Sequence, residues 1–172
     1  METGSLLGDG IKLAIDAGFK TVISIEIAKK YYDHCINRFK GNDNVKLHIG
    51  DSADILGNVI KDINEPITFW LDGHYSGEAC QIGKYLSPLI QELDILKLHP
   101  IKTHTILIDD IRCWKDISNE YHDNFDMASV TQKILEINDK YKVDFIDGVQ
   151  TRVRKGRIKT RVFPKDILVA TV

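Results

Sequence analysis

The sequence predicts an α/β fold built on a parallel sheet. Short β-branched or apolar runs alternate with helical stretches up to about residue 146, and this alternation is typical of βαβ units. Three of those runs lead directly into acids, at Glu26, Asp72 and Asp109. Because the carboxyl ends of parallel strands meet at one edge of a sheet, where ligands bind, we expect these acids to lie close together.

In the first half of the chain, the elements follow from apolar spacing and from the residues that end each run. A helix is expected from Gly8 to Gly18, where a glycine stops it, and the β-branched run Thr21–Glu26 predicts a strand. Three further elements follow in the same alternation: a helix over Ala28–Lys40, a strand over Val45–Ile49 and a helix over Ser52–Ile63.

In the second half, Ile67–Leu71 is an unbroken apolar run, as expected for a strand covered on both faces. Residues 73–86 predict a loop, and Pro88 suits the first turn of a helix over Leu89–Leu98. The remaining elements are a strand over Thr105–Ile108, a helix over residues 126–139 and strands over Lys142–Ile146 and Ile167–Val172.

Residues 151–165 form a strongly basic segment between the last two strands. It holds seven Lys or Arg residues and no acid, so with a net charge of −2 the rest of the chain carries −9. Apolar residues alternate with the charges, which predicts a hairpin-like insertion turning around Lys155–Gly156. These cations could bind phosphate, nucleic acid or an anionic acceptor, but Phe163 is the only ring available for base stacking. We therefore expect a solvated hairpin that discourages edge pairing, and no nucleic-acid partner.

Length and composition indicate a single domain over residues 1–172, with 43% hydrophobic and 28% charged residues. No apolar run is long enough to span a membrane, and the first residues lack the pattern of a signal peptide. The three cysteines form no C-x-x-C pair, which indicates neither a disulfide framework nor a structural zinc site. These features predict a cytoplasmic protein without a membrane partner.

The chain opens with a glycine-spaced turn headed by an acid, Glu2-Thr3-Gly4-Ser5-Leu6-Leu7-Gly8. Small residues let a backbone approach a ligand, and the N–H groups at the start of the following helix favour an anion. Such a turn normally follows a buried strand, yet only Met1 precedes Glu2. We therefore expect the first strand to be absent, as in an N-terminally truncated chain.

From Glu2 to Asp110 these features resemble the class I S-adenosylmethionine-dependent methyltransferases. The opening turn resembles their E-x-G-x-G-x-G cofactor loop, with Leu6 in place of the central glycine, and Glu26 ends the second strand, where their ribose-binding acid belongs. The blocks 69–75 (FWLDGHY) and 106–110 (ILIDD) are similar to a subset that includes metal-assisted O-methyltransferases.

The resemblance implies a three-layer sandwich with a Rossmann-like, mostly parallel sheet and an antiparallel C-terminal strand pair. The missing first strand would lie between strands 21–26 and 67–71. The implied cofactor-binding residues are Glu2, Gly4, Ser5, Gly8, Glu26, Asp51, Ser52 and Asp72. Two of them have other interpretations, because Glu26 could pair with a nearby lysine and Asp51 could simply cap the helix that begins near Ser52.

Asp72, Asp109 and Asp110 follow buried strands and would place like charges close together, which is costly without a cation or a shared proton. A hard cation such as Mg²⁺ on Asp109 and Asp110 would relieve that cost. Alternatively, one acid caps a turn and another binds the cofactor. His74 and Asp72 are the candidate catalytic pair, with His74 taking a proton from an acceptor hydroxyl; a loop histidine bonded to backbone is the alternative.

The implied activity is methyl transfer from S-adenosylmethionine to the oxygen of a small hydroxylated acceptor. A different class of function is a non-catalytic remnant of this fold that acts as an interaction module, and a third is a nucleotide- or dinucleotide-binding domain that uses Glu26 in the same way. Self-association into a homo-oligomer is a further expectation. The sequence does not identify the acceptor.

Overall fold

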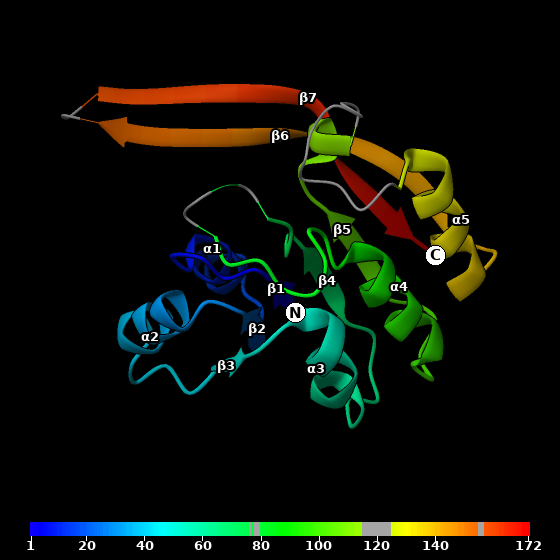
Figure 1. Ribbon diagram of the computed structural model, residues 1–172, viewed down its shortest axis with the longest axis horizontal. Helices are drawn as coiled ribbons and strands as arrows, with labels where there is room; N and C mark the ends of the chain where they lie inside the picture. Colours follow the sequence, from blue (N-terminus) through cyan, green and yellow to red (C-terminus); the bar gives the residue numbers. More distant parts are fainter. Residues whose placement is uncertain (76, 78–79, 115–124, 155–156) are drawn as a thin grey trace.

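The computed structural model describes residues 1–75, 77, 80–114, 125–154 and 157–172, and its seven strands form one sheet in the order β3-β2-β1-β4-β5-β7-β6 (Figure 1). The strands are β1 (Glu2–Thr3), β2 (Val22–Glu26), β3 (Val45–Ile49), β4 (Thr68–Leu71), β5 (Thr105–Ile108), β6 (Lys142–Arg154) and β7 (Arg157–Thr171). The first five are parallel, and β7 runs antiparallel to both β5 and β6. The predicted α/β fold with an antiparallel C-terminal pair is confirmed.

Helices lie where the apolar spacing predicts them. They are α1 (Asp9–Asp16), α2 (Lys29–Arg38), α3 (Ser52–Ile60), α4 (Leu89–Leu98) and α5 (Met127–Ile137), with a 3₁₀ turn at Ile111–Trp114. Pro88 is the N-cap of α4, and Asp126 caps α5 through a reciprocal pair of hydrogen bonds with Ser129. Within the described residues, none of these helices has the length and apolarity needed to cross a membrane.

The centre of the sheet corrects one expectation. The first strand is not absent, because Glu2 and Thr3 pair with β2 on one side and with β4 on the other. Met1 extends the contact: its carbonyl accepts from the Trp70 N–H at 2.8 Å and its amino group donates to the Thr68 carbonyl at 2.9 Å. β2 and β4 flank this position as predicted, and neither pairs directly with the other.

The two faces of the sheet are covered unequally. On one face, α3, α4 and α5 pack on β4, β5 and β7 around a large core that includes Phe69, Leu93 and Ile134. On the other face, α1 and α2 cover β2 and β3 through a small cluster of Ile11, Val22 and Cys35. Over β4 and β5 this second face is an apolar groove of about 590 Å³, whose lining includes Trp70, Leu107, Leu13 and Phe19.

The C-terminal strands are longer than predicted. β6 and β7 pair continuously from Lys142–Thr171 out to Arg154–Arg157, with one irregularity between Ile146 and Gly148. Their outer halves project from the body as a two-stranded ribbon (Figure 1). The predicted turn at Lys155–Gly156 lies outside the described residues, but the strands on both sides have the register of a hairpin.

Candidate active site

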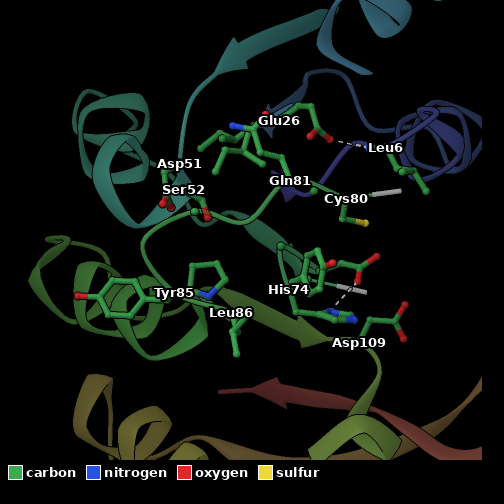
Figure 2. A pocket seen from close by; sticks show the side chains of 18 of the residues that line it. Leu6, Glu26, Asp51, Ser52, His74, Cys80, Gln81, Tyr85, Leu86 and Asp109 are labelled. Atoms are coloured by element: carbon green, nitrogen blue, oxygen red, sulfur yellow. Dashed lines mark hydrogen bonds and ion pairs between the residues drawn. The ribbon is translucent and has the colours of Figure 1, made fainter. Parts of the chain in front are cut away.

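One cleft of about 280 Å³ lies at the carboxyl ends of the parallel strands (Figure 2). Eight of the sequence-predicted site residues line it: Gly4, Glu26, Asp51, Ser52, Asp72, His74, Asp109 and Asp110. Figure 2 shows Glu26 and Asp51 on one side of the cleft, and His74 and Asp109 on another. Residues far apart in the sequence therefore meet where the strand topology predicts, and their individual roles stay predictions.

Gly4 and Leu6 of the opening turn also line this cleft. Gly4 has φ of +85°, and a Cβ there would lie 2.4 Å from the backbone oxygen of Asp72, so only glycine allows the two segments this close approach. Leu6 has φ of +43°, a conformation that glycine adopts most easily. The position that departs from the glycine pattern in sequence therefore keeps a glycine-like backbone.

Glu26 is held by the backbone on both carboxylate oxygens. Oε2 accepts from the Leu6 N–H at 2.8 Å and Oε1 accepts from the Ala28 N–H at 2.8 Å. The side chain is buried at the edge of the cleft. Each oxygen has a second lone pair, so this carboxylate can accept hydroxyl groups from a ligand while the backbone keeps its orientation.

Asp51 and Ser52 begin α3 at the same edge. Asp51 is the N-cap of α3: its Oδ1 accepts from the Ala53 N–H at 3.0 Å, and its Oδ2 accepts from the Lys84 N–H at 2.9 Å. The capping interpretation of Asp51 is thus confirmed, and its carboxylate still lines the cleft. Ser52 is buried and hydrogen-bonds to Glu92 of α4.

Three predicted cofactor residues do not line this cleft. Glu2 is buried on the α1 side of the sheet, where it accepts a hydrogen bond from Ser24 Oγ at 2.5 Å, and burial raises its pKa to about 7. Ser5 bonds to the same Ser24 hydroxyl at 2.6 Å. Gly8 is the N-cap of α1, with φ of +82°. The side-chain positions of these residues face away from the cleft, and the three residues contribute to the conformation of the opening turn.

His74 lies between two carboxylates. Its Nδ1 is 3.3 Å from Asp72 Oδ1, and its Nε2 is 3.2 Å from Asp110 Oδ2. Burial alone would lower the pKa of His74, but the contacts with Asp110 and Cys113 and the charges of Asp72 and Asp110 outweigh burial and raise it well above its ordinary value. Burial, more than its acidic neighbours, also raises the pKa of Asp72. The resting pair is therefore an imidazolium beside a carboxyl group that protonates readily.

Arg112 was not among the candidate residues of the sequence, and it supplies the cation that the crowded acids require. Its Nη1 lies 2.5 Å from Asp110 Oδ1 and also pairs with Asp166, a buried acid of β7, while its backbone N–H donates to Asp166 Oδ1 at 2.9 Å. His74 and Arg112 together overcome the effect of burial and lower the pKa of Asp110. A signal was present in the sequence, since Arg112 follows Asp110 by two positions.

This arrangement does not fit the predicted Mg²⁺ site. Among the described residues, two groups have ligand atoms within 4.8 Å of one another: Asp109, Asp110 and Asp166, and His74, Asp110 and Cys113. Asp72 belongs to neither. The first group already has the Arg112 guanidinium as its counter-ion, bonded to two of its three carboxylates. A second cation there would have to displace Arg112.

Glu92 is a second residue that sequence reasoning missed. It is 1% exposed, hydrogen-bonds to Ser52 and Thr3, and leaves its Oε1 without a partner among the described residues. Burial raises its pKa to about 7. Its spacing from Leu89 and Leu96 places it on the buried face of α4, so an acid within an apolar stripe was the available signal.

Comparison with known proteins bears on the fold. No protein-family model matches the chain, and no curated protein matches it. Among solved structures, an O-methyltransferase from Bacillus cereus in complex with SAH is 19% identical, with 99% of this chain and 72% of that chain covered at a TM-score of 0.56. The O-methyltransferase TomG from Streptomyces achromogenes, in complex with SAM, is 14% identical, with 99% of this chain and 71% of that chain covered at a TM-score of 0.57.

A precorrin-6y C5,15-methyltransferase from Geobacter metallireducens is also similar, at 12% identity, with 99% of this chain and 75% of that chain covered at a TM-score of 0.55. The chain has the class I methyltransferase fold. By their names, two of these three proteins are O-methyltransferases and one is a C5,15-methyltransferase, so this fold is compatible with more than one kind of methyl acceptor.

Proposed function

We propose that this protein transfers a methyl group from S-adenosylmethionine to an oxygen of a small hydroxylated acceptor. The observation that carries the proposal is the division of the cleft: backbone-held carboxylates lie on one side, and a histidine between two aspartates lies on the other. The first side suits a nucleoside and the second suits proton transfer. The fold supports the same assignment.

On the cofactor side, Glu26 would accept the ribose hydroxyls with its two remaining lone pairs, and Ser52 and Asp51 would lie beside the adenine. Gly4 keeps the turn close to the Asp72 backbone, and the methionine part of the cofactor would lie against this junction, since both residues line the cleft. S-adenosylmethionine supplies an already activated methyl group when bound. The protein would therefore accelerate the reaction by positioning the two reactants and excluding water.

On the acceptor side, the hydroxyl must lose its proton as the new O–CH₃ bond forms. His74 and Asp72 form a coupled pair, so the proton passes to the pair rather than to one isolated base. Because His74 rests as an imidazolium, Asp72 is the first proton acceptor, and His74 becomes a base only after it releases its own proton. Asp110, held by Arg112, keeps the imidazole in place. No step requires a metal.

The test is titration of the protein with S-adenosylhomocysteine, and separately with NAD and ATP, by isothermal titration calorimetry. Preferential binding of S-adenosylhomocysteine supports the proposed activity. Preference for NAD or ATP would instead support the nucleotide-binding alternative, and no binding of any of the three would support a non-catalytic interaction module. A cytoplasmic location remains an expectation from the sequence.

A further inference from the structure

The outer halves of β6 and β7 form a ribbon to which the proposed methyl transfer assigns no role. This distal ribbon comprises residues 148–154 and 157–163, and within the described residues no third strand pairs with it. It projects beyond the sheet (Figure 1). At about 3.3 Å per residue, the four steps from Gln150 to Arg154 extend it by roughly 13 Å.

The register separates two kinds of residue onto two faces. Directly opposed positions share a face, and faces alternate along a strand. Among the side chains that the structure describes, one face carries the pairs Val149–Val162 and Thr151–Thr160 together with Ile158, and the other, called here the basic face, carries the pair Gln150–Arg161 together with Lys159 and Phe163. Lys159 and Arg161 are cationic, none of these residues is acidic, and the segment 151–165 as a whole holds seven Lys or Arg residues and no acid.

This placement costs stability in the isolated protein. Like charges on one face of a ribbon repel each other, and Lys159 and Arg161 are neighbours on the basic face. A charged edge that only discourages aggregation does not require its cations to gather on one face. An anionic ligand would reverse the sign of the interaction, because neighbouring cations would then share a negative group.

The basic face is continuous with the mouth of the cleft. Phe163 lies at its base, with the Arg161 guanidinium 4.5 Å and the Arg112 guanidinium 4.1 Å from the ring centroid. Arg112 and Gln150 also line the cleft. A long anion bound along the ribbon would therefore reach the rim of the site.

We propose that the basic face of the distal ribbon binds the phosphate backbone of a nucleic acid. A two-stranded ribbon is narrow enough to enter the major groove of a duplex, and phosphate contacts need no aromatic stacking, so the single aromatic residue of this segment is no obstacle. The chain outside residues 151–165 carries −9 and repels such a ligand, which confines binding to the ribbon. The proposal does not depend on methyl transfer.

The test is fluorescence anisotropy of a short labelled DNA duplex and a labelled RNA strand, each titrated without S-adenosylmethionine over a range of salt concentrations. The variant replaces Lys159 and Arg161 by Glu. The control replaces Lys140 and Lys142 by Glu, which makes the same change in net charge at exposed positions away from the distal ribbon.

The wild type should bind at least one probe with an affinity that falls steeply with salt. The Lys159/Arg161 variant should lose about tenfold or more in affinity, and its slope of log affinity against log salt should shrink by roughly two, while the control keeps the wild-type slope. Absence of binding, or equal losses in both variants, would overturn the proposal. So would a wild-type dimer, seen by light scattering, that only the Lys159/Arg161 variant dissociates, because the ribbon would then bind the acidic body of a second copy.

Discussion

The two sides of the cleft hold their carboxylates in different ways. On the cofactor side, both oxygens of Glu26 accept backbone N–H groups. On the acceptor side, Asp72 and Asp110 depend on the side chains of His74 and Arg112. Backbone donors are fixed and cannot exchange a proton with the carboxylate at ordinary pH, whereas a histidine can.

The difference suggests a division of labour. A nucleoside needs a site whose shape exists before binding, because ordering that site on binding would reduce affinity. Removal of a proton from an acceptor needs groups whose charge can change. Three changes separate the two roles: one at the junction between the two sides, one at the counter-ions of the acceptor side, and one at a neutral histidine that contrasts with the charged His74.

The largest effect is expected at the junction. Gly4→Ala places a Cβ 2.4 Å from the Asp72 backbone oxygen at a left-handed φ, so we expect a loss of about 4 kcal/mol in the free energy of unfolding. Gly18→Ala is the matched control, because Gly18 has φ of +87° and nothing within 4 Å of its Cβ position. It should cost only about 1–2 kcal/mol, the cost of the left-handed conformation alone. Urea denaturation measures both, and equal losses would refute the close approach.

Arg112→Gln should destabilise the protein by about 3 kcal/mol, because it leaves the buried Asp166 without its cation and leaves Asp110 with His74 alone. Arg38→Gln removes an exposed ion pair with Asp9 and should cost less than about 1 kcal/mol. Thermal unfolding with Mg²⁺ or EDTA sharpens the comparison. Mg²⁺ should raise the Tm of Arg112→Gln and leave the wild type unchanged; a wild type that EDTA destabilises would restore the metal hypothesis.

A second histidine site shows the opposite electrostatics. His104 is buried at the other end of the sheet, accepts from the Ile67 N–H at Nδ1 and contacts His99 through Nε2. Burial, with smaller effects of His99 and Lys102, lowers the pKa of His104 from 6.5 to about 4. Between pH 6.5 and about pH 4, the unfolded state binds a proton at His104 more tightly than the folded state does. The stability from neutral His104 is therefore present above pH 6.5 and lost as pH falls to 4, by about 3 kcal/mol.

Urea denaturation at a series of pH values tests this loss. In the wild type, the free energy of unfolding should fall as pH falls from 6.5 to 4. His104→Asn should remove much of this acid-side slope, while His34→Asn, a change at an exposed position, should keep it. His74 has the reverse sign: its raised pKa gives stability that is fully present below 6.5 and is lost as pH rises through the folded-state pKa. An acid-side slope that both single variants retain would exclude His104 as its source.

Much of the fold was predictable because local and global signals agree. Strands such as Thr105–Ile108 are apolar and β-branched, and Gly18 and Pro88 mark helix boundaries. β1 was not predictable, because two residues carry no periodicity and their extended conformation depends on hydrogen bonds from β2 and β4. The alternation of apolar and charged residues predicted the hairpin at residues 151–165, but it did not show that the hairpin strands are extensions of β6 and β7.

The site was predictable in location and less so in chemistry. The topology that brings Glu26, Asp72 and His74 to one edge follows from the order of strands and helices. Counter-ions do not follow from that order. Arg112 reaches Asp110 because a 3₁₀ turn follows β5, and it meets Asp166 because β7 returns beside that turn.

The most direct test of the division of labour is calorimetric titration of S-adenosylhomocysteine into the wild type, Glu26→Ala and His74→Gln. Loss of a hydrogen-bonding carboxylate should weaken binding to Glu26→Ala by about 1.5–3 kcal/mol, or roughly 10- to 150-fold, whereas His74→Gln should stay within about twofold of the wild type. A Glu26→Ala variant that binds as tightly as the wild type, or a His74→Gln variant that loses as much as Glu26→Ala, would contradict the account.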